Sequence, residues 1–217
     1  MMNRLIAFGC SHTYGEGLPD CIGTLNKPGV PIPPPSKFSW PYLLADKLSL
    51  ECINYAVCGA SNKEIQHSIL DADLNKNDTV VVLWTHHNRT CFLHSKKKSP
   101  YQFMPSYTEK RKGNPPARRN LNKIFYTHLF NEYDLQNETY VAIDHSYRYL
   151  INYGVKVYNF TFSRDKKMIS SELDFVPNWF LSPIKNLKLI DDYGADNMHP
   201  GLKAHDDLAS QVYEIVK

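Results

Sequence analysis

The chain has 217 residues, of which 42% are hydrophobic and 12% aromatic, and its formal net charge is +3. This length suffices to bury one sizeable core, and the composition excludes a wholly disordered chain. No apolar run approaches the ~20 residues that cross a bilayer, so no transmembrane segment is expected. The small net charge gives no reason to expect a nucleic-acid partner.

The start of the chain and its cysteines bear on the cellular compartment. The apolar run after Arg4 ends at Gly9 and is typical of a strand rather than of a secretory signal. The five cysteines are odd in number and form no Cys-x-x-Cys pair, which does not favour a disulfide scaffold. We therefore expect a cytoplasmic protein.

The first half of the chain alternates between strand and helix patterns. Residues 4–8 (RLIAF) form a short apolar run, which predicts a strand. Prolines are concentrated in 18–38, and this concentration predicts a loop near the rim of a site. Ser39 is the expected N-cap of a helix that runs to Leu48. Asn62 is the expected N-cap of a second helix, whose apolar spacing continues to Leu74. Strands are expected at 51–56 and at the β-branched run 80–84.

The second half begins with a basic stretch. Between residues 94 and 123 there are nine Lys or Arg against the single acid Glu109. This stretch is a candidate contact for an anionic ligand, although a solvated loop would have the same composition. Helices are then expected at 121–133 and 139–153, a strand at 155–160, a short helix near 179–181 and a final helix from Pro200 or Gly201.

Alternating strands and helices predict a three-layer α/β/α sandwich around a parallel sheet of about five strands. We expect one domain over 1–217, with the Pro-rich loop 18–38 and a basic insertion at 94–120. Ligands bind such sheets beyond the carboxyl ends of the strands. Ser11, Gly59 and the 85–88 loop each follow an expected strand, so all three should lie at this edge.

Two short motifs at opposite ends of the chain carry the chemistry. Ser11 follows the first strand beside a glycine, and Asp196 precedes His199 by three residues. A serine hydroxyl attacks an acyl carbon when an imidazole takes its proton and a carboxylate fixes that imidazole. The motifs supply these three roles, with Ser11 as nucleophile, His199 as base and Asp196 as its orienting partner.

The chain resembles the SGNH (GDSL-type) hydrolase superfamily in three of its four sequence blocks. The turn Gly9-Cys10-Ser11 is similar to the family's Gly-Asp-Ser, with cysteine in the place of aspartate. Gly59 in the segment NYAVCGASN resembles the glycine whose N–H faces the oxyanion, and Asp196-x-x-His199 matches the last block. The resemblance implies a flavodoxin-like fold and an oxyanion hole that includes the N–H groups of Ser11 and Gly59.

The third block departs from the family pattern. Where the family has Gly-x-Asn-Asp after a strand, this chain has VLWTHHNR at 82–89. In direct register His86 replaces the asparagine of the oxyanion hole, whereas a shift of two residues brings Asn88 to that place. Both side chains can donate a hydrogen bond, so either residue could be the third donor.

These motifs predict a serine esterase that uses Ser11, His199 and Asp196. The expected substrate is a small-molecule or glycan ester, such as an O-acetyl or other acyl group on a carbohydrate or lipid. No cofactor is expected, and the histidines near residue 86 match no zinc pattern. Two alternatives are a catalytically silent binding module and an O-acyltransferase that uses a sugar hydroxyl as acceptor.

Overall fold

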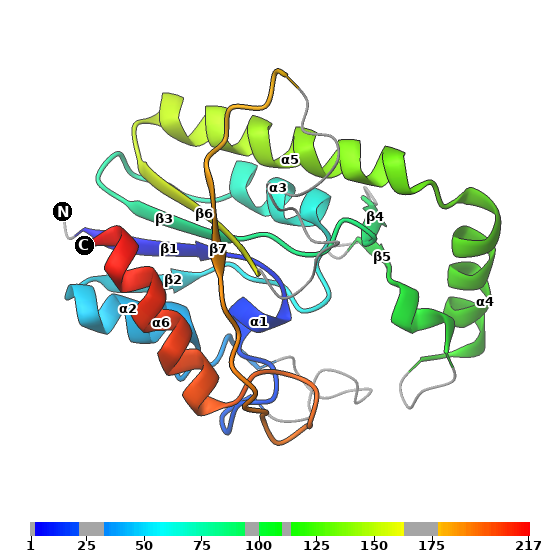
Figure 1. Ribbon diagram of the computed structural model, residues 1–217, viewed down its shortest axis with the longest axis horizontal. Helices are drawn as coiled ribbons and strands as arrows, with labels where there is room; N and C mark the ends of the chain where they lie inside the picture. Colours follow the sequence, from blue (N-terminus) through cyan, green and yellow to red (C-terminus); the bar gives the residue numbers. More distant parts are fainter. Residues whose placement is uncertain (1–2, 22–32, 94–99, 110–113, 163–177) are drawn as a thin grey trace.

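The computed structural model describes residues 3–21, 33–93, 100–109, 114–162 and 178–217. In these ranges five strands form one sheet in the order β2-β1-β3-β6-β7, with every neighbouring pair parallel (Figure 1). The strands are β1 (Arg4–Phe8), β2 (Glu51–Asn54), β3 (Thr79–Leu83), β6 (Lys156–Phe162) and β7 (Ile184–Leu187). This doubly wound order is flavodoxin-like, and the predicted parallel sheet is confirmed.

The central strands are buried on both faces, as their β-branched and aliphatic residues require. Val80, Val81 and Val82 of β3 are fully buried, and Val81 lies opposite Ala7 of β1 and Tyr158 of β6. Successive side chains of a strand point to opposite faces. The sheet therefore separates two apolar cores, one on each side.

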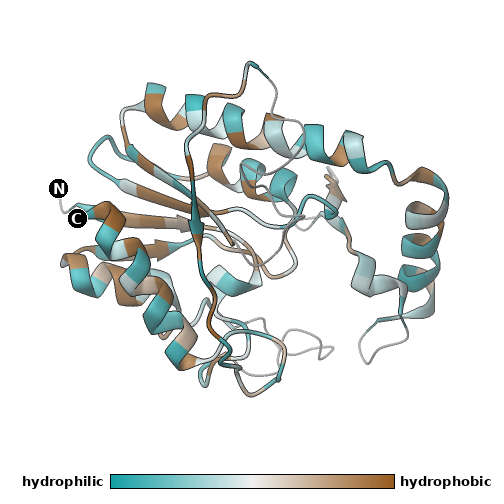
Figure 2. Cartoon of the chain, viewed as in Figure 1, coloured by the Kyte–Doolittle hydropathy of each residue, from teal (hydrophilic) through white to brown (hydrophobic). Residues whose placement is uncertain are grey.

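Helices cover both faces of the sheet and form the outer layers (Figure 1). One core packs under α3 (Asn62–Leu70) and α5 (Glu132–Tyr153), and the other under α2 (Trp40–Leu48) and α6 (Leu202–Val216). The strands are mostly hydrophobic whereas these helices alternate between apolar and polar residues (Figure 2). The predicted three-layer sandwich is therefore confirmed.

The packing of α2 against α6 depends on a buried histidine. Ser39 precedes α2 as expected, and the Trp40 N–H donates to His205 Nδ1 at 3.0 Å. Burial lowers the pKa of His205 to about 3, so its ring is neutral and can accept this hydrogen bond. His205 thus satisfies a backbone donor at the start of α2 that has no acceptor within the helix.

Several helix boundaries differ from the sequence predictions. Ser61, not Asn62, is the N-cap of α3, because its Oγ accepts from the Glu64 N–H at 3.3 Å, and the helix ends at Leu70. The expected helices at 121–133 and 139–153 are divided differently. A helix α4 (Pro116–Ile124) continues into a π-helical turn η2 (Phe125–Leu129), and α5 then runs from Glu132 to Tyr153.

The region before the last helix was predicted least well. The short helix expected near 179–181 is not formed, because 178–179 is a turn and the next residues lead directly to β7. Strand β7 was not predicted. Its sequence IKNL lies at the sheet edge with two exposed residues, so it lacks the continuous apolar pattern of the inner strands. The predicted final helix is confirmed as α6, with Gly201 as its N-cap.

Small elements extend beyond the carboxyl end of the sheet, at the right of Figure 1. Strands β4 (Thr90–Phe92) and β5 (Tyr101–Phe103) pair antiparallel, and η1 (Pro105–Thr108) leads towards α4. We call residues 90–129 the insertion, and this range contains the basic insertion expected at 94–120. Its basic segments 94–99 and 110–113, and 22–32 of the Pro-rich loop, lie outside the described residues. Among the helices that the structure describes, none is long and apolar enough to cross a bilayer.

Candidate active site

Ser11 is the first residue of a short helix, α1 (Ser11–Tyr14), at the carboxyl end of β1. The N–H groups of Thr13 and Tyr14 both donate to the Cys10 carbonyl at 3.0 Å. The N–H of Ser11 itself has no acceptor inside the helix, as at any helix start. Ser11 is only 5% exposed, so its hydroxyl lies in a largely enclosed place at the predicted edge of the sheet.

The loop that carries Gly59 is held against β1 and α1. The Val57 N–H donates to the Gly9 carbonyl at 3.1 Å, and Asn54 Nδ2 donates to the Thr13 carbonyl at 2.8 Å. Gly59 has a φ of +76°, and a Cβ there would lie 2.9 Å from Gln102 Oε1. Only glycine adopts this conformation readily. The loop therefore keeps the Gly59 backbone beside the turn that carries Ser11.

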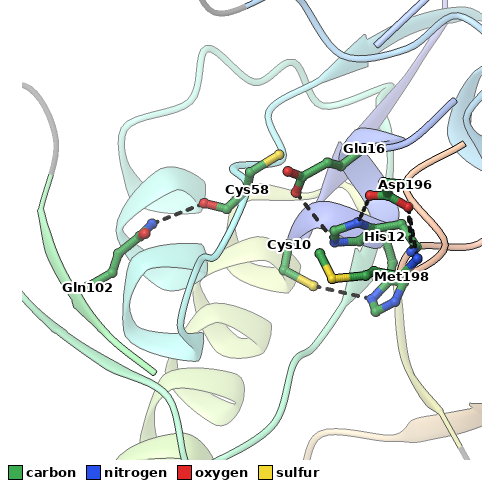
Figure 3. A network of polar contacts seen from close by, with 8 residues as sticks. Cys10, His12, Glu16, Cys58, Gln102, Asp196 and Met198 are labelled. Carbon is green, nitrogen blue, oxygen red and sulfur yellow. Dashed lines mark hydrogen bonds and ion pairs between the residues drawn. The ribbon is translucent and has the colours of Figure 1, made fainter. Parts of the chain in front are cut away.

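Asp196 and His199 form a close pair in the loop before α6. His199 Nδ1 and Asp196 Oδ2 are 2.5 Å apart, and Asp196 Oδ1 accepts from the N–H groups of Met198 and His199 at 3.0 Å each (Figure 3). Burial opposes ionisation of Asp196, but these hydrogen bonds outweigh it and lower its pKa. An ionised Asp196 thus orients the imidazole, as an orienting carboxylate should.

A contact between two glycines joins this loop to the loop that follows α1. The Ala195 N–H donates to the Gly17 carbonyl at 3.0 Å, and a Cβ on Gly194 would lie 2.6 Å from that carbonyl oxygen. On the other side, a Cβ on Gly17 would lie 2.8 Å from Asp196 Oδ1. Any larger residue would separate the two backbones. This glycine contact places the Asp196–His199 pair beside the segment that begins with Ser11.

The second ring nitrogen of His199 faces a residue that the sequence did not indicate. Glu16 Oε2 lies 3.4 Å from His199 Nε2 (Figure 3). In the described part of the chain, the Ser11 hydroxyl makes no hydrogen bond to His199. Catalytic hydrogen bonds often form only when substrate is bound. The only signal for Glu16 in the sequence is an acidic side chain shortly after the serine.

Cys10, which replaces the family's aspartate, pairs with His12. The Cys10 Sγ and His12 Nδ1 are 3.8 Å apart (Figure 3), and the His12 ring packs against Phe162 and His199. Burial of Cys10 opposes ionisation, but the hydrogen bond and charge of His12 and the charge of Arg89 bring the pKa of this thiol well below its ordinary value. His12 is therefore engaged with Cys10 rather than with the serine.

The loop after β3 is anchored from two sides. Asn62 is buried, and it accepts from the Thr85 N–H at 2.8 Å and donates to the Thr85 carbonyl at 2.9 Å. Further along, the Tyr126 hydroxyl donates to the Asn88 carbonyl at 2.7 Å. These contacts fix the backbone that carries both candidates for the third oxyanion donor. The choice between Asn88 and His86 stays a prediction.

The histidines of this loop contact each other and an acid of α5. The rings of His86 and His87 are 5.0 Å apart, and His87 Nε2 lies 3.4 Å from Glu132 Oε1. Among the residues that the structure describes, no three His, Cys, Asp or Glu side chains are grouped so as to hold a metal ion.

The insertion contributes side chains that no sequence pattern singles out. Gln102 Nε2 donates to the Cys58 carbonyl at 3.2 Å (Figure 3) and to Glu64 Oε2 at 2.9 Å. Burial raises the pKa of Glu64 to about 7, although the Gln102 hydrogen bond opposes the rise. The Tyr107 hydroxyl lies 3.4 Å from the place of a Cβ on Gly59. The insertion thus closes over the Gly59 side of the site.

Solved structures resemble this chain in fold, whereas no family model and no curated protein sequence matches it. The acetyl xylan esterase Est2A of the rumen bacterium Butyrivibrio proteoclasticus aligns with 98% of this chain and 63% of its own, at 14% identity and a TM-score of 0.52. The chain has the SGNH hydrolase fold. The lipase Lip_vut3 from a goat rumen metagenome aligns with 98% of this chain and 96% of its own, at 12% identity and a TM-score of 0.48.

The match to Est2A covers the whole architecture of this chain but not of that esterase. The chain spans less than two thirds of the length of Est2A. A family two carbohydrate esterase from Clostridium thermocellum aligns with 100% of this chain and 64% of its own, at 10% identity and a TM-score of 0.49. What this chain shares with Est2A is therefore the SGNH hydrolase fold, over part of that protein.

Proposed function

We propose that the protein is a serine ester hydrolase with Ser11 as nucleophile, His199 as general base and Asp196 as the orienting carboxylate. The observation that carries the proposal is the Asp196–His199 pair, which the contact between Gly17 and Gly194 holds against the segment that begins with Ser11. An SGNH hydrolase fold with these groups at the carboxyl edge of its sheet supports the same conclusion.

In the first step, His199 Nε2 leaves Glu16 and takes the proton of the Ser11 hydroxyl. The Ser11 oxygen bonds to the ester carbon, and the carbonyl electrons move to the oxygen. The tetrahedral intermediate then collapses, His199 gives its proton to the leaving alcohol, and an acyl-enzyme remains. Water attacks the acyl-enzyme in the same way and releases the acid.

The oxyanion needs donors that already point at the place where its charge develops. The N–H groups of Ser11 and Gly59 are the first two in this proposal, because the hydrogen bond between Val57 and Gly9 keeps both turns adjacent. Asn88 or His86 supplies a third. Asp196, ionised by its hydrogen bonds, stabilises the imidazolium that forms in each step.

For the substrate we propose a short acyl ester, such as an O-acetyl group on a carbohydrate. Est2A is an acetyl xylan esterase, and its shared fold supports a carbohydrate as the alcohol. Gln102 and Tyr107 lie close to Gly59, so in this proposal they limit the length of the acyl group and can contact its end.

Labelling with a fluorophosphonate tests the nucleophile without knowledge of the substrate. We expect a single adduct at Ser11 by peptide mass spectrometry, together with hydrolysis of p-nitrophenyl acetate. Ser11→Ala should lose the adduct and about 10⁴-fold or more of the turnover, since triad members act as a unit. Ser210 lies on α6, and the control Ser210→Ala should retain both the adduct at Ser11 and the turnover.

The opposite outcomes decide between the proposed function and its alternatives. An adduct at another residue, with Ser11→Ala still active, would reject Ser11 as nucleophile. No adduct and no turnover would favour a silent binding module, which agrees with Glu16 lying on His199 Nε2. Formation of an acylated sugar in place of free acid would identify an acyltransferase.

A further inference from the structure

Arg89 lies at the end of the turn that contains both candidates for the third oxyanion donor. Its N–H donates to the His86 carbonyl at 3.3 Å, and the neighbouring Asn88 carbonyl is bound by Tyr126 of η2. The backbone of Arg89 is therefore held between the sheet edge and the insertion. Its side chain starts from the same edge as Ser11 and Gly59.

One nitrogen of the Arg89 guanidinium lacks a hydrogen-bond partner among the described residues. Its Nη1 is fully buried and makes no hydrogen bond, and no carboxylate in the described ranges forms an ion pair with it. A buried donor on a charged group is costly when it is unsatisfied, and buried charges are normally paired. This cost points to a binding partner that the described residues do not provide.

The charge of Arg89 acts both next to the proposed nucleophile and in the insertion. Arg89 acts electrostatically on Cys10, which directly precedes Ser11, and on Tyr107 and Tyr126 of the insertion. The Tyr107 hydroxyl in turn lies 3.4 Å from the place of a Cβ on Gly59. The guanidinium and this hydroxyl are thus two hydrogen-bond donors on the side of the site where the substrate would extend.

A second arginine makes this side still more positive. The Arg118 guanidinium carbon lies 3.7 Å above the centre of the Tyr107 ring. The acid Glu16 opposes this positive charge at Tyr107, although its Oε2 lies 3.4 Å from His199 Nε2. An arginine fork matches a carboxylate in geometry and charge, because it can donate two parallel hydrogen bonds to the two oxygens.

We propose that Arg89 and the Tyr107 hydroxyl form an anion subsite beside Ser11, and that the natural ester carries a carboxylate close to its scissile carbonyl. This inference deepens the proposed function and rests on it. Arg89 is then a specificity-determining residue: it binds the substrate carboxylate and orients the carbonyl towards Ser11. The carboxylate would satisfy the buried Nη1.

Two esters of equal chain length test the subsite. Mono-p-nitrophenyl succinate carries a terminal carboxylate, and p-nitrophenyl butyrate is its neutral counterpart. We expect Arg89→Gln to lower the ratio of kcat/KM for the succinate to that for the butyrate by about 10-fold or more, the loss typical of a charged hydrogen bond. Arg89→Lys should keep part of this preference. Lys123→Gln, an exposed charge on α4, controls for overall charge and should leave the ratio unchanged.

If Arg89→Gln lowers kcat/KM equally for both esters, the proposed subsite is wrong and Arg89 acts in the oxyanion hole. An unchanged ratio with a normal thermal melting curve would also reject the proposal. If Arg89→Gln fails to fold, the ratio measured for Arg89→Lys and for Tyr107→Phe decides in its place, since the subsite predicts a loss for both.

A binding measurement separates this inference from the proposed function. Succinate should bind the Ser11→Ala protein in calorimetry about 10-fold or more tightly than it binds the Ser11→Ala, Arg89→Gln protein. Such binding without any turnover in the wild type would retain the subsite and reject the hydrolase. Ester turnover with no Arg89-dependent succinate binding would retain the hydrolase and reject the subsite.

Discussion

The two sides of the candidate site are built in different ways. On the triad side, Asp196 and His199 are three residues apart, and the hydrogen bonds of Asp196 stay within one loop. On the insertion side, Gly59, Gln102 and Tyr107 come from separate segments and meet only in the folded chain. The first arrangement follows from a short motif, whereas the second depends on tertiary packing. Under the proposed function, the residues for chemistry and those for selectivity therefore come from different kinds of sequence signal.

The largest effect is expected on the triad side. His199→Gln should reduce ester turnover by about 10⁴-fold, because no other group then takes the Ser11 proton. His199→Ala should lose as much, because neither replacement can act as a base. His67→Gln, an exposed histidine of α3, is the matched control and should keep full turnover. Full turnover in His199→Gln would remove His199 from the mechanism.

A smaller effect is expected where the two sides meet, at the third oxyanion donor. If Asn88 donates, Asn88→Ala should lower kcat about 10²-fold with little change in KM, since the bond forms mainly in the transition state. His86→Ala should then be mild. The reverse pattern would assign the role to His86, and two mild variants would leave the hole with its two N–H donors alone.

On the insertion side, Glu64 should make stability depend on pH. Because its pKa is about 7 when folded and 4.5 ordinarily, the folded chain keeps a proton that the unfolded chain releases between these values. Stability should therefore fall as pH rises through this window, by as much as about 3 kcal/mol. Glu64→Gln should remove this fall and make the protein more stable at pH 8.

Urea unfolding at pH 5 and pH 8 measures this difference. Exposed Glu51, at the start of β2, gives the control Glu51→Gln, which should retain the wild-type pH dependence. A Glu64→Gln protein that is equally or less stable at pH 8 would show that Glu64 is ionised without cost beside Gln102.

The smallest effect is expected at Glu16, which links the two sides through its position near His199. Its carboxylate lies 3.4 Å from the Nε2 that takes the Ser11 proton in the proposed mechanism. Glu16→Gln removes the charge that Nε2 must leave, so kcat for p-nitrophenyl acetate should rise by about threefold or less. Glu214→Gln on α6 is the control. A fall in kcat in Glu16→Gln would mean that Glu16 assists proton removal.

The sequence was sufficient for the features that depend on local patterns. The sheet strands β1, β3 and β6 follow from short apolar runs, and the pairing of Asp196 with His199 follows from their spacing. Strand β7 was missed because an edge strand with exposed residues has no continuous apolar pattern. The break between α4 and α5 was misplaced because helical spacing does not reveal a π-helical turn.

Glu16, Arg89 and Tyr107 could not be selected from the sequence for a related reason. Each is an ordinary polar residue in its own segment, and it becomes notable only through neighbours that are distant in sequence. For Arg89 the signal is an unsatisfied buried nitrogen, which exists only after folding. The same holds for Gly17 and Gly194. A Cβ on Gly17 would meet the Asp196 carboxylate, and a Cβ on Gly194 would meet the Gly17 carbonyl.

The contact between Gly17 and Gly194 also orders events during synthesis. The ribosome makes the segment with Ser11 long before the loop with Asp196 and His199. Early strands can pair while synthesis continues, but the Gly17 carbonyl meets the Ala195 N–H only after residue 195 has emerged. Under the proposed function, a nascent chain therefore carries a nucleophile without a base, and it becomes reactive only after residues 194–199 have joined the folded sheet.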